Sequence, residues 1–286
     1  MKKFRILIAG CGEVGTAAGL LLARHHKVYG LRRNASLLPS EIIPVTADLN
    51  NPATLKKLPC IDIIIYCAAP SKSSTAIVTD SYTDTYLKGF SNLISALPNP
   101  PQHIFFTSST SVYAQGNHQW VNEQSATLPT TEKGIIMRSA EQQVLNSQKS
   151  STVIRFSGIY GKSRLHLFNQ VLNGKAFTAE PVQYSNRIHL NDCAGVLCHL
   201  VNKLANHDTI ASLYLASDSL PSPISEVMSW LAKMSNNPVE PQKSKRATPS
   251  KRCDNTLLLK TGYELLHPDF KSGYAEVLAG YTQKKM

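Results

Sequence analysis

The stretch Ala9-Gly10-Cys11-Gly12-Glu13-Val14-Gly15 decides how this chain folds. It stands between an apolar run at residues 4–9, which predicts a buried strand, and a pattern at 14–25 that predicts a helix. In this spacing the first glycine permits a tight turn, the second lets the backbone approach a pyrophosphate, and the third lets helix and strand pack closely. The helix N-terminus adds N–H groups and a positive dipole end. We therefore expect a dinucleotide-binding turn formed by Gly10, Cys11, Gly12, Glu13, Val14 and Gly15, with an ordinary strand–helix turn as the alternative.

Outward from this turn, expected strands alternate with expected helices. The strands are predicted at residues 4–9, 27–31, 42–48, 61–67, 103–107 and 152–156, and the helices at 14–25, 51–58, 80–97 and 135–148. This alternation predicts a doubly wound parallel α/β sheet, because parallel strands need crossover helices. After residue 161 the pattern loosens, with helices expected at 165–172, 192–205 and 225–235 and a strand at 212–216. We predict a Rossmann domain over residues 1–160, to which 187–217 return, and a smaller substrate lobe formed by 161–186 and 218–286.

Composition limits the class of protein. The 286 residues are 42% hydrophobic and 17% charged, which excludes global disorder. Six cysteines without a CxxC pair argue against a disulfide scaffold or a zinc ribbon and favour a reducing cytoplasm. The net charge of +11 leaves nucleic acid, a membrane surface or an anionic substrate open as partners.

The amino-terminal segment resembles a signal peptide, with a basic start and an apolar middle. Glu13 and three glycines interrupt it, and no run of about 18 apolar residues occurs in the sequence. We therefore expect a folded strand, turn and helix, with no membrane partner.

The region after the second expected strand addresses the choice of dinucleotide. NAD sites usually carry an acidic residue there, but this chain has Arg32 and Arg33, whose guanidinium groups suit a 2′-phosphate. NADP(H) is therefore favoured, NAD(H) stays open, and the alternative is that both arginines face solvent. Asp48 and Leu49 are expected beside the adenine. The expected neighbours of the nicotinamide ribose are Cys67, Ala68 and Ala69.

With these pieces in place, the chain resembles the extended short-chain dehydrogenase/reductases, the NAD(P)-dependent epimerase/dehydratases of nucleotide sugars. Further matching segments are residues 89–94, 107–113, 155–161 and 187–192. The resemblance implies that Ser108, Phe156 and Ser157 contact the cofactor. It also implies that Ser109 orients a substrate hydroxyl.

The resemblance fails at the two residues that do the chemistry. A Tyr-x-x-x-Lys pair, in which tyrosine is the acid/base, should begin the helix that contains Glu141; these positions hold Lys133 and Met137. Lys133 can replace the tyrosine if burial or nearby charge favours its neutral form, and Tyr113 is another potential proton donor. The alternative for both is a scaffold or surface role.

Two functions from different classes follow. The first is an NAD(P)-binding oxidoreductase, epimerase or dehydratase that acts on an anionic, sugar-like substrate, with the basic loop 243–252 at the rim of its site. The second is a catalytically silent dinucleotide-binding sensor or partner protein. The resemblance also implies a homodimer formed through residues 80–97 and 135–148. No nucleic-acid partner is expected, because the basic segments lack interleaved aromatic residues and a known binding motif.

Overall fold

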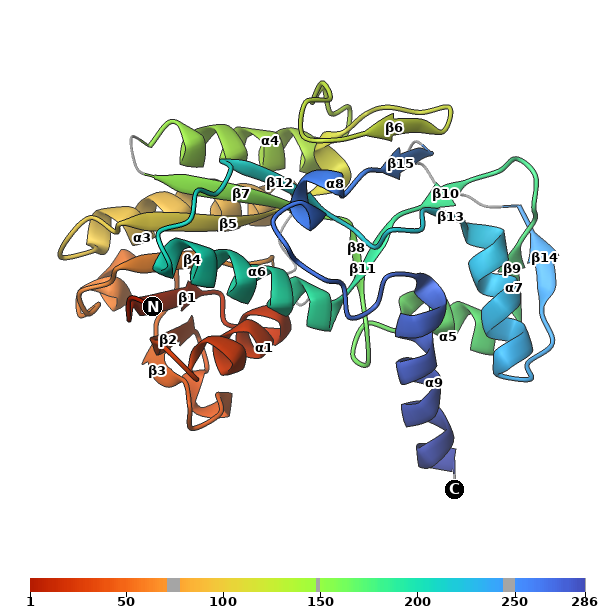
Figure 1. Ribbon diagram of the computed structural model, residues 1–286, viewed down its shortest axis with the longest axis horizontal. Coiled ribbons are helices and arrows are strands. Elements are labelled where there is room, and N and C mark those ends of the chain that lie inside the picture. The colour runs from red at the N-terminus through yellow and green to blue at the C-terminus, as the bar shows by residue number, and fades with distance from the viewer. Residues whose placement is uncertain (71–77, 148–149, 244–249, 286) are drawn as a thin grey trace. The chain divides into compact units, whose positions relative to one another are not determined.

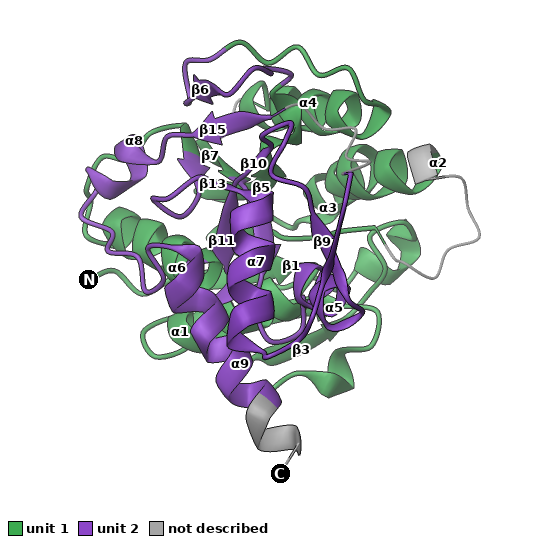
Figure 2. Ribbon diagram, turned by 90° about the vertical axis from the view of Figure 1, so that its right-hand side faces the viewer, with its two compact units in different colours: residues 1–113, 126–155, 193–214 green, residues 114–125, 156–192, 215–286 purple. Residues whose placement is uncertain are grey.

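The computed structural model describes residues 1–70, 78–147, 150–243 and 250–285, and the chain divides into two compact units (Figure 2). Unit 1 comprises residues 1–113, 126–155 and 193–214. Unit 2 comprises residues 114–125, 156–192 and 215–286. This division assigns residues 114–125, 156–160, 187–192 and 215–217 to unit 2, whereas the sequence groups them with the dinucleotide domain.

Unit 1 is built on a seven-stranded sheet with the order β12-β7-β5-β4-β1-β2-β3. Its strands are β1 (Arg5–Ala9), β2 (Lys27–Arg32), β3 (Ile43–Thr46), β4 (Ile63–Tyr66), β5 (His103–Ser109), β7 (Ser151–Phe156) and β12 (Leu213–Ala216). The pairs β1–β2, β1–β4, β2–β3 and β4–β5 are parallel. The chain order reverses between β1 and β4, which is the switch point where ligands bind in doubly wound sheets. The predicted fold class is confirmed.

The sheet of unit 1 is covered by helices on both faces. β4, and β1 after its exposed first residue Arg5, are apolar and buried, as expected for strands covered on both faces. α3 (Gly89–Ala96) and α4 (Glu132–Leu145) cover one face, while α1 (Glu13–Leu22) and α6 (Leu190–Ala205) cover the other (Figure 1). His26, which follows α1, and Asn202 of α6 are joined by a 3.3 Å hydrogen bond, which ties these two helices together.

Two predicted helices of unit 1 differ from the structure. The helix expected at 80–97 is α2 (Val78–Thr83), a π-helical segment at Asp84–Lys88 and then α3. The π-helical segment ends next to Gly89, which lies against the Tyr66 hydroxyl. A Cβ added to Gly89 would lie 3.0 Å from that oxygen. The helix expected at 51–58 is only a 3₁₀ turn at Pro52–Leu55, because Asn51 and Pro52 favour a short capped turn.

Unit 2 has its own apolar core. Its helices are α5 (His166–Leu172), α7 (Ile224–Met234), α8 (Thr256–Leu259) and α9 (Phe270–Lys285). Its short strands pair as β6 (Gln119–Val121) with β15 (Lys251–Cys253), β8 (Gly158–Tyr160) with β11 (Arg187–His189), β9 (Lys175–Phe177) with β14 (Glu240–Gln242), and β10 (Tyr184–Ser185) with β13 (Ser222–Pro223). Phe168, Leu231 and Phe270 are fully buried in the core cluster, which joins α5, α7 and α9.

No described helix is both long enough and apolar enough to cross a bilayer. The amino-terminal segment forms β1, the glycine turn and α1, the strand, turn and helix that its sequence predicts.

Candidate functional site

The glycine turn of unit 1 has the backbone geometry that its sequence predicts. Gly10 has φ +80°, and a Cβ there would overlap the Cα of Ala68, so only glycine fits. A Cβ on Gly15 would lie 2.8 Å from Ile8 Cγ2, so this glycine lets α1 pack against β1. Gly12 is exposed and meets nothing closer than 3.9 Å, which leaves room for a ligand above the turn. Glu13 and Val14 begin α1, with Glu13 exposed and Val14 half-buried.

Cys11, in the same turn, is fully buried. Burial raises the pKa of its thiol, so the reactive thiolate is disfavoured. Its side chain therefore fills space beneath the turn, while its carbonyl accepts a hydrogen bond from Arg32 Nη1 at 3.4 Å. This contact brings the half-buried guanidinium of Arg32 to the glycine turn, whereas Arg33 is exposed.

The turn after β3 is held by its own hydrogen bonds. The Asn50 amide donates to Asp48 Oδ1 at 3.0 Å, and Asn92 Nδ2 of α3 donates to the Leu49 carbonyl at 2.8 Å. The Asp48 side chain thus supports its own turn, and Leu49 is buried.

The residues after β4 lie directly beside the glycine turn. The Cys67 amide donates to the Ala9 carbonyl at 2.8 Å, and Ala68 faces Gly10. Burial raises the pKa of the Cys67 thiol to about 12, so it is neutral at physiological pH. Ala69 is exposed. The structure therefore brings together the turns after β1, β2 and β4 at the switch point of the sheet.

A buried polar network lies at the end of β5. Glu141 of α4 and Arg155 of β7 form a two-pronged ion pair, with Arg155 Nη2 2.7 Å from Glu141 Oε2 and Arg155 Nε 2.8 Å from Oε1. Ser108 Oγ donates to Glu141 Oε1 at 2.6 Å, and Arg155 Nη1 donates to the Tyr113 hydroxyl at 2.8 Å. Burial alone would lower the pKa of Arg155, but its hydrogen bond to Glu141 and the charge of that residue raise it. Ser108 and Tyr113, both buried, thus belong to an internally neutralised cluster.

The predicted catalytic residues are placed differently. Ser109 ends β5 half-buried, and its hydroxyl accepts a hydrogen bond from the Ser111 amide at 3.2 Å. Lys133, in the first turn of α4, is exposed. Among the described residues, no hydrogen bond joins Lys133 to Ser109. Met137, at the position expected for lysine, is buried at 4% exposure.

Tyr82 is a functional candidate that sequence reasoning missed. It lies on α2, and the Lys133 ammonium is 5.4 Å from its ring centroid. The two residues are 51 positions apart, and only the packing of α2 beside α4 brings a phenol and an ammonium together. Without the fold, Tyr82 has no local motif to distinguish it from any other tyrosine.

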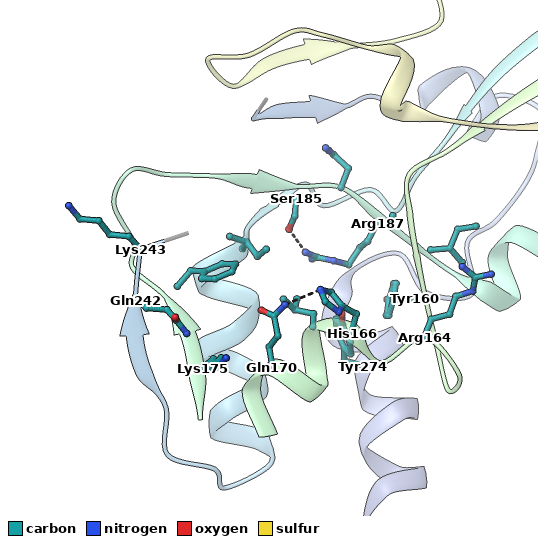
Figure 3. Close-up of a pocket in the computed structure, with 16 residues that line it drawn as sticks. Tyr160, Arg164, His166, Gln170, Lys175, Ser185, Arg187, Gln242, Lys243 and Tyr274 are labelled. Atoms are coloured by element: carbon teal, nitrogen blue, oxygen red, sulfur yellow. Dashed lines mark hydrogen bonds between the residues drawn. The ribbon is translucent and has the colours of Figure 1, made fainter. Parts of the chain in front are cut away.

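Unit 2 carries a cavity of about 620 Å³, within the usual size range of small-molecule sites (Figure 3). Its cationic lining residues are Arg164, Lys175, Arg187 and Lys243, and no acidic residue is among the described lining residues. Tyr160, Phe177 and Tyr274 supply aromatic surface. Arg187, which is buried, donates to Ser185 Oγ and packs over the Phe270 ring at 5.5 Å.

Three further predictions concern unit 2. Phe156 and Ser157 are buried, and the Ser157 amide donates to the Ala216 carbonyl at 2.9 Å. Lys243 of the basic loop lines the cavity, whereas residues 244–249 of that loop lie outside the described residues.

Residues 6–179 match the model of the NAD dependent epimerase/dehydratase family. A Methylobacillus flagellatus protein classed with the NAD-dependent epimerase/dehydratases is 34% identical over 98% of this chain and 99% of its own, with a TM-score of 0.82. No curated protein matches the chain.

Two more distant structures share the fold. UDP-glucose 4-epimerase from Thermotoga maritima, solved with UDP-glucose, is 14% identical over 99% of this chain and 100% of its own, with a TM-score of 0.80. UDP-glucuronic acid 4-epimerase from Bacillus cereus, solved with UDP-glucuronic acid and NAD, is 17% identical over 98% of this chain and 99% of its own, with a TM-score of 0.77.

Proposed function

The chain belongs to the NAD-dependent epimerase/dehydratase family, and from this premise we propose that it binds NADP(H) and acts on a nucleotide-sugar-like substrate.

The glycine turn, Arg32 and Ala68 fit a dinucleotide. The cradle at Gly10 and Gly12 leaves no room for side chains beneath the turn and leaves open space above it. The start of α1 supplies N–H groups for a pyrophosphate. Arg32, held at the turn by its bond to the Cys11 carbonyl, is our proposed ligand for a 2′-phosphate, with Arg33 as an outer charge. A bound nicotinamide would supply hydride transfer.

The residues that line the cavity in unit 2 are the main support for the proposed class of substrate. Four cationic side chains and no carboxylate among its described lining residues make it attractive to a multiply charged anion. The aromatic side chains add surface on which a base or sugar ring can pack. A nucleoside diphosphate sugar combines these chemical features, and the two distant structures were solved with such ligands.

We assign the proton transfer to Tyr82 together with Lys133, and substrate orientation to Ser109. Tyr82 offers the phenol and Lys133 the adjacent cation, which are the two groups that a Tyr-x-x-x-Lys pair normally supplies. Tyr113 is a positioning residue in this assignment, because its buried hydroxyl already accepts a hydrogen bond from Arg155.

The catalytically silent alternative has one observation in its favour. Buried Met137 occupies the position from which a lysine would reach the cofactor ribose. A sensor would bind the dinucleotide through the glycine turn and turn over no sugar.

Calorimetric titration with NADPH and NADH tests the cofactor. We expect the wild type to prefer NADPH, and Arg32→Asp to weaken NADPH at least about tenfold while changing NADH little, because only NADPH carries the 2′-phosphate. Arg33→Asp is the matched control, with a smaller effect. Equal loss for both cofactors would refute the 2′-phosphate assignment.

A panel of nucleotide sugars assayed with NADP⁺ and NAD⁺ tests the chemistry. Tyr82→Phe keeps the ring under the Lys133 ammonium and removes only the hydroxyl, so kcat should fall at least about 100-fold with KM little changed. Tyr29→Phe, on β2, is the control. If the wild type turns over no panel member while binding cofactor, the sensor function replaces the proposal.

A further inference from the structure

A cluster of two histidines and one glutamate lies in unit 2 outside the cavity. His189 ends β11, His267 lies before α9, and Glu276 is on α9. One ligand atom from each of the three residues lies within 4.8 Å of the other two. From this geometry we propose that His189, His267 and Glu276 bind a zinc ion.

The spacing of the donor atoms supports the proposal. His267 Nε2 and Glu276 Oε2 are 3.2 Å apart. In a tetrahedral zinc site with bonds of about 2.0–2.1 Å, neighbouring ligand atoms lie roughly 3.3 Å apart. This ion pair therefore has the length of one edge of a coordination tetrahedron, and His189, whose ligand atom lies within 4.8 Å of both, would shift to complete a three-ligand face.

His189 has a nitrogen to offer the ion, and its ring packs against the rings of Tyr160 and His267. It is 2% exposed, and its Nε2 atom has no hydrogen-bond partner among the described residues. Its Nδ1 atom only accepts a long hydrogen bond from the Asn191 amide, at 3.3 Å. A buried imidazole nitrogen without a partner is costly, and a reoriented ring that binds a metal removes that cost.

The fold holds the second histidine in place. The Asp192 carboxylate accepts hydrogen bonds from the Leu266 amide at 2.7 Å and from the His267 amide at 3.0 Å. The Tyr263 hydroxyl donates to the same carboxylate at 3.0 Å. The segment that presents His267 is thus anchored before any ion binds, which reduces the entropy cost of assembling the site.

The donor set and the surroundings favour zinc over a harder cation. Imidazole nitrogens suit zinc, whereas magnesium prefers oxygen ligands. The His267 and Glu276 side chains are 14% and 31% exposed, so an ion can enter from solvent. The Lys162 ammonium lies 3.4 Å from Glu276 Oε1 and opposes the ion by its charge, while Asn191 Nδ2 donates to Oε2 at 3.4 Å.

A bound ion would tie β11 to α9. The ion would join a short strand to the helix that packs in the core of unit 2 and so stabilise that unit, with water in the fourth coordination position. This role is independent of the proposed oxidoreductase function.

The test uses full-length, tag-free protein freed of metal by chelator dialysis, in a Cys60→Ser background because Cys60 is an exposed thiol. Titration with ZnCl₂ should give one ion per chain, and zinc at about 100 times its Kd should raise the Tm by about 4–5 °C. MgCl₂ should produce neither effect. Absence of zinc binding would overturn the proposal.

Variants locate the ion. Glu276→Gln and His267→Ala should each weaken zinc at least about tenfold, while His25→Ala, which removes an exposed histidine, should change nothing. Lys162→Met should tighten binding by a few fold, because an opposing charge is lost. X-ray absorption should show nitrogen and oxygen neighbours only. Sulfur neighbours, or zinc affinity unchanged in both ligand variants, would place the ion elsewhere and refute the site.

Discussion

The two units use charge in opposite ways. In unit 1, Glu141 and Arg155 are buried and satisfy each other, with Ser108 and Tyr113 completing their hydrogen bonds. In unit 2, cationic side chains gather around a cavity that has no acidic residue among its described lining residues. A buried ion pair neutralises its own charges, whereas a cavity lined by cations and by no described acidic residue attracts an anionic ligand. The net charge of +11 therefore says less about function than the distribution of these groups.

The largest effect is expected from a substitution that breaks the neutral pair of unit 1. Glu141→Gln leaves the Arg155 guanidinium buried without its counter-charge, which should lower the free energy of unfolding by about 3–5 kcal/mol. Urea denaturation followed by circular dichroism measures the change. Asp62→Asn, which weakens the Arg5–Asp62 pair, whose side chains are 45% and 14% exposed, is the control and should cost less. If the two variants lose equal stability, the buried pair does not order unit 1.

Replacing both Glu141 and Arg155 tests whether the loss comes from the stranded charge. The double variant Glu141→Leu/Arg155→Met should recover much of the loss, because no fully buried charge is then stranded; Arg138, which also pairs with Glu141, has a side chain 28% exposed to solvent. A double variant as unstable as Glu141→Gln would show that packing or the bonds to Ser108 and Tyr113 dominate.

A smaller effect is expected from the cavity of unit 2. Lys175→Ala removes one exposed cation from its lining and should weaken UDP binding roughly tenfold, with little change in stability. Calorimetry at low and high salt measures the affinity for UDP and how much of it depends on electrostatic attraction. Lys233→Ala removes an exposed charge from α7 outside the cavity lining and should leave Kd unchanged. Equal losses in both variants would indicate general attraction by net charge.

The smallest effect concerns a buried acid of unit 2. Burial raises the pKa of Asp218 to about 8, although the nearby charge of Arg187 opposes this shift. An unfolded Asp218 loses its proton near pH 4, so its contribution to stability is complete below that pH and is lost as pH rises to about 8. Asp218→Asn should therefore gain stability relative to wild type between pH 5 and pH 8, by at least about 1 kcal/mol. Denaturation curves at both pH values test it. A constant difference would mean that Asp218 is already charged at pH 5 and neutralises Arg187, which would make unit 2 resemble unit 1.

Much of the dinucleotide region was predictable because its determinants are local. Gly10 is required because its φ is positive, and Gly15 because a side chain there would collide with Ile8. Both requirements arise where a strand turns at once into a helix. The alternation of apolar strands and helices likewise indicated the parallel sheet, although it does not reveal the π-helical segment at Asp84–Lys88. The short strands of unit 2 and α9 were missed, because two- or three-residue strands carry no periodicity and α9 is weakly amphipathic.

The sequence by itself determined the doubly wound fold, the glycine turn and the absence of the usual Tyr-x-x-x-Lys pair. The tertiary structure alone decided that Arg32 lies at the turn, that Tyr82 lies beside Lys133, and that His189, His267 and Glu276 converge. The physical reason is the separation along the chain between the residues that determine each feature. Backbone conformation depends on neighbours a few residues away, whereas a site assembled from separate elements depends on packing between segments that the linear pattern does not relate.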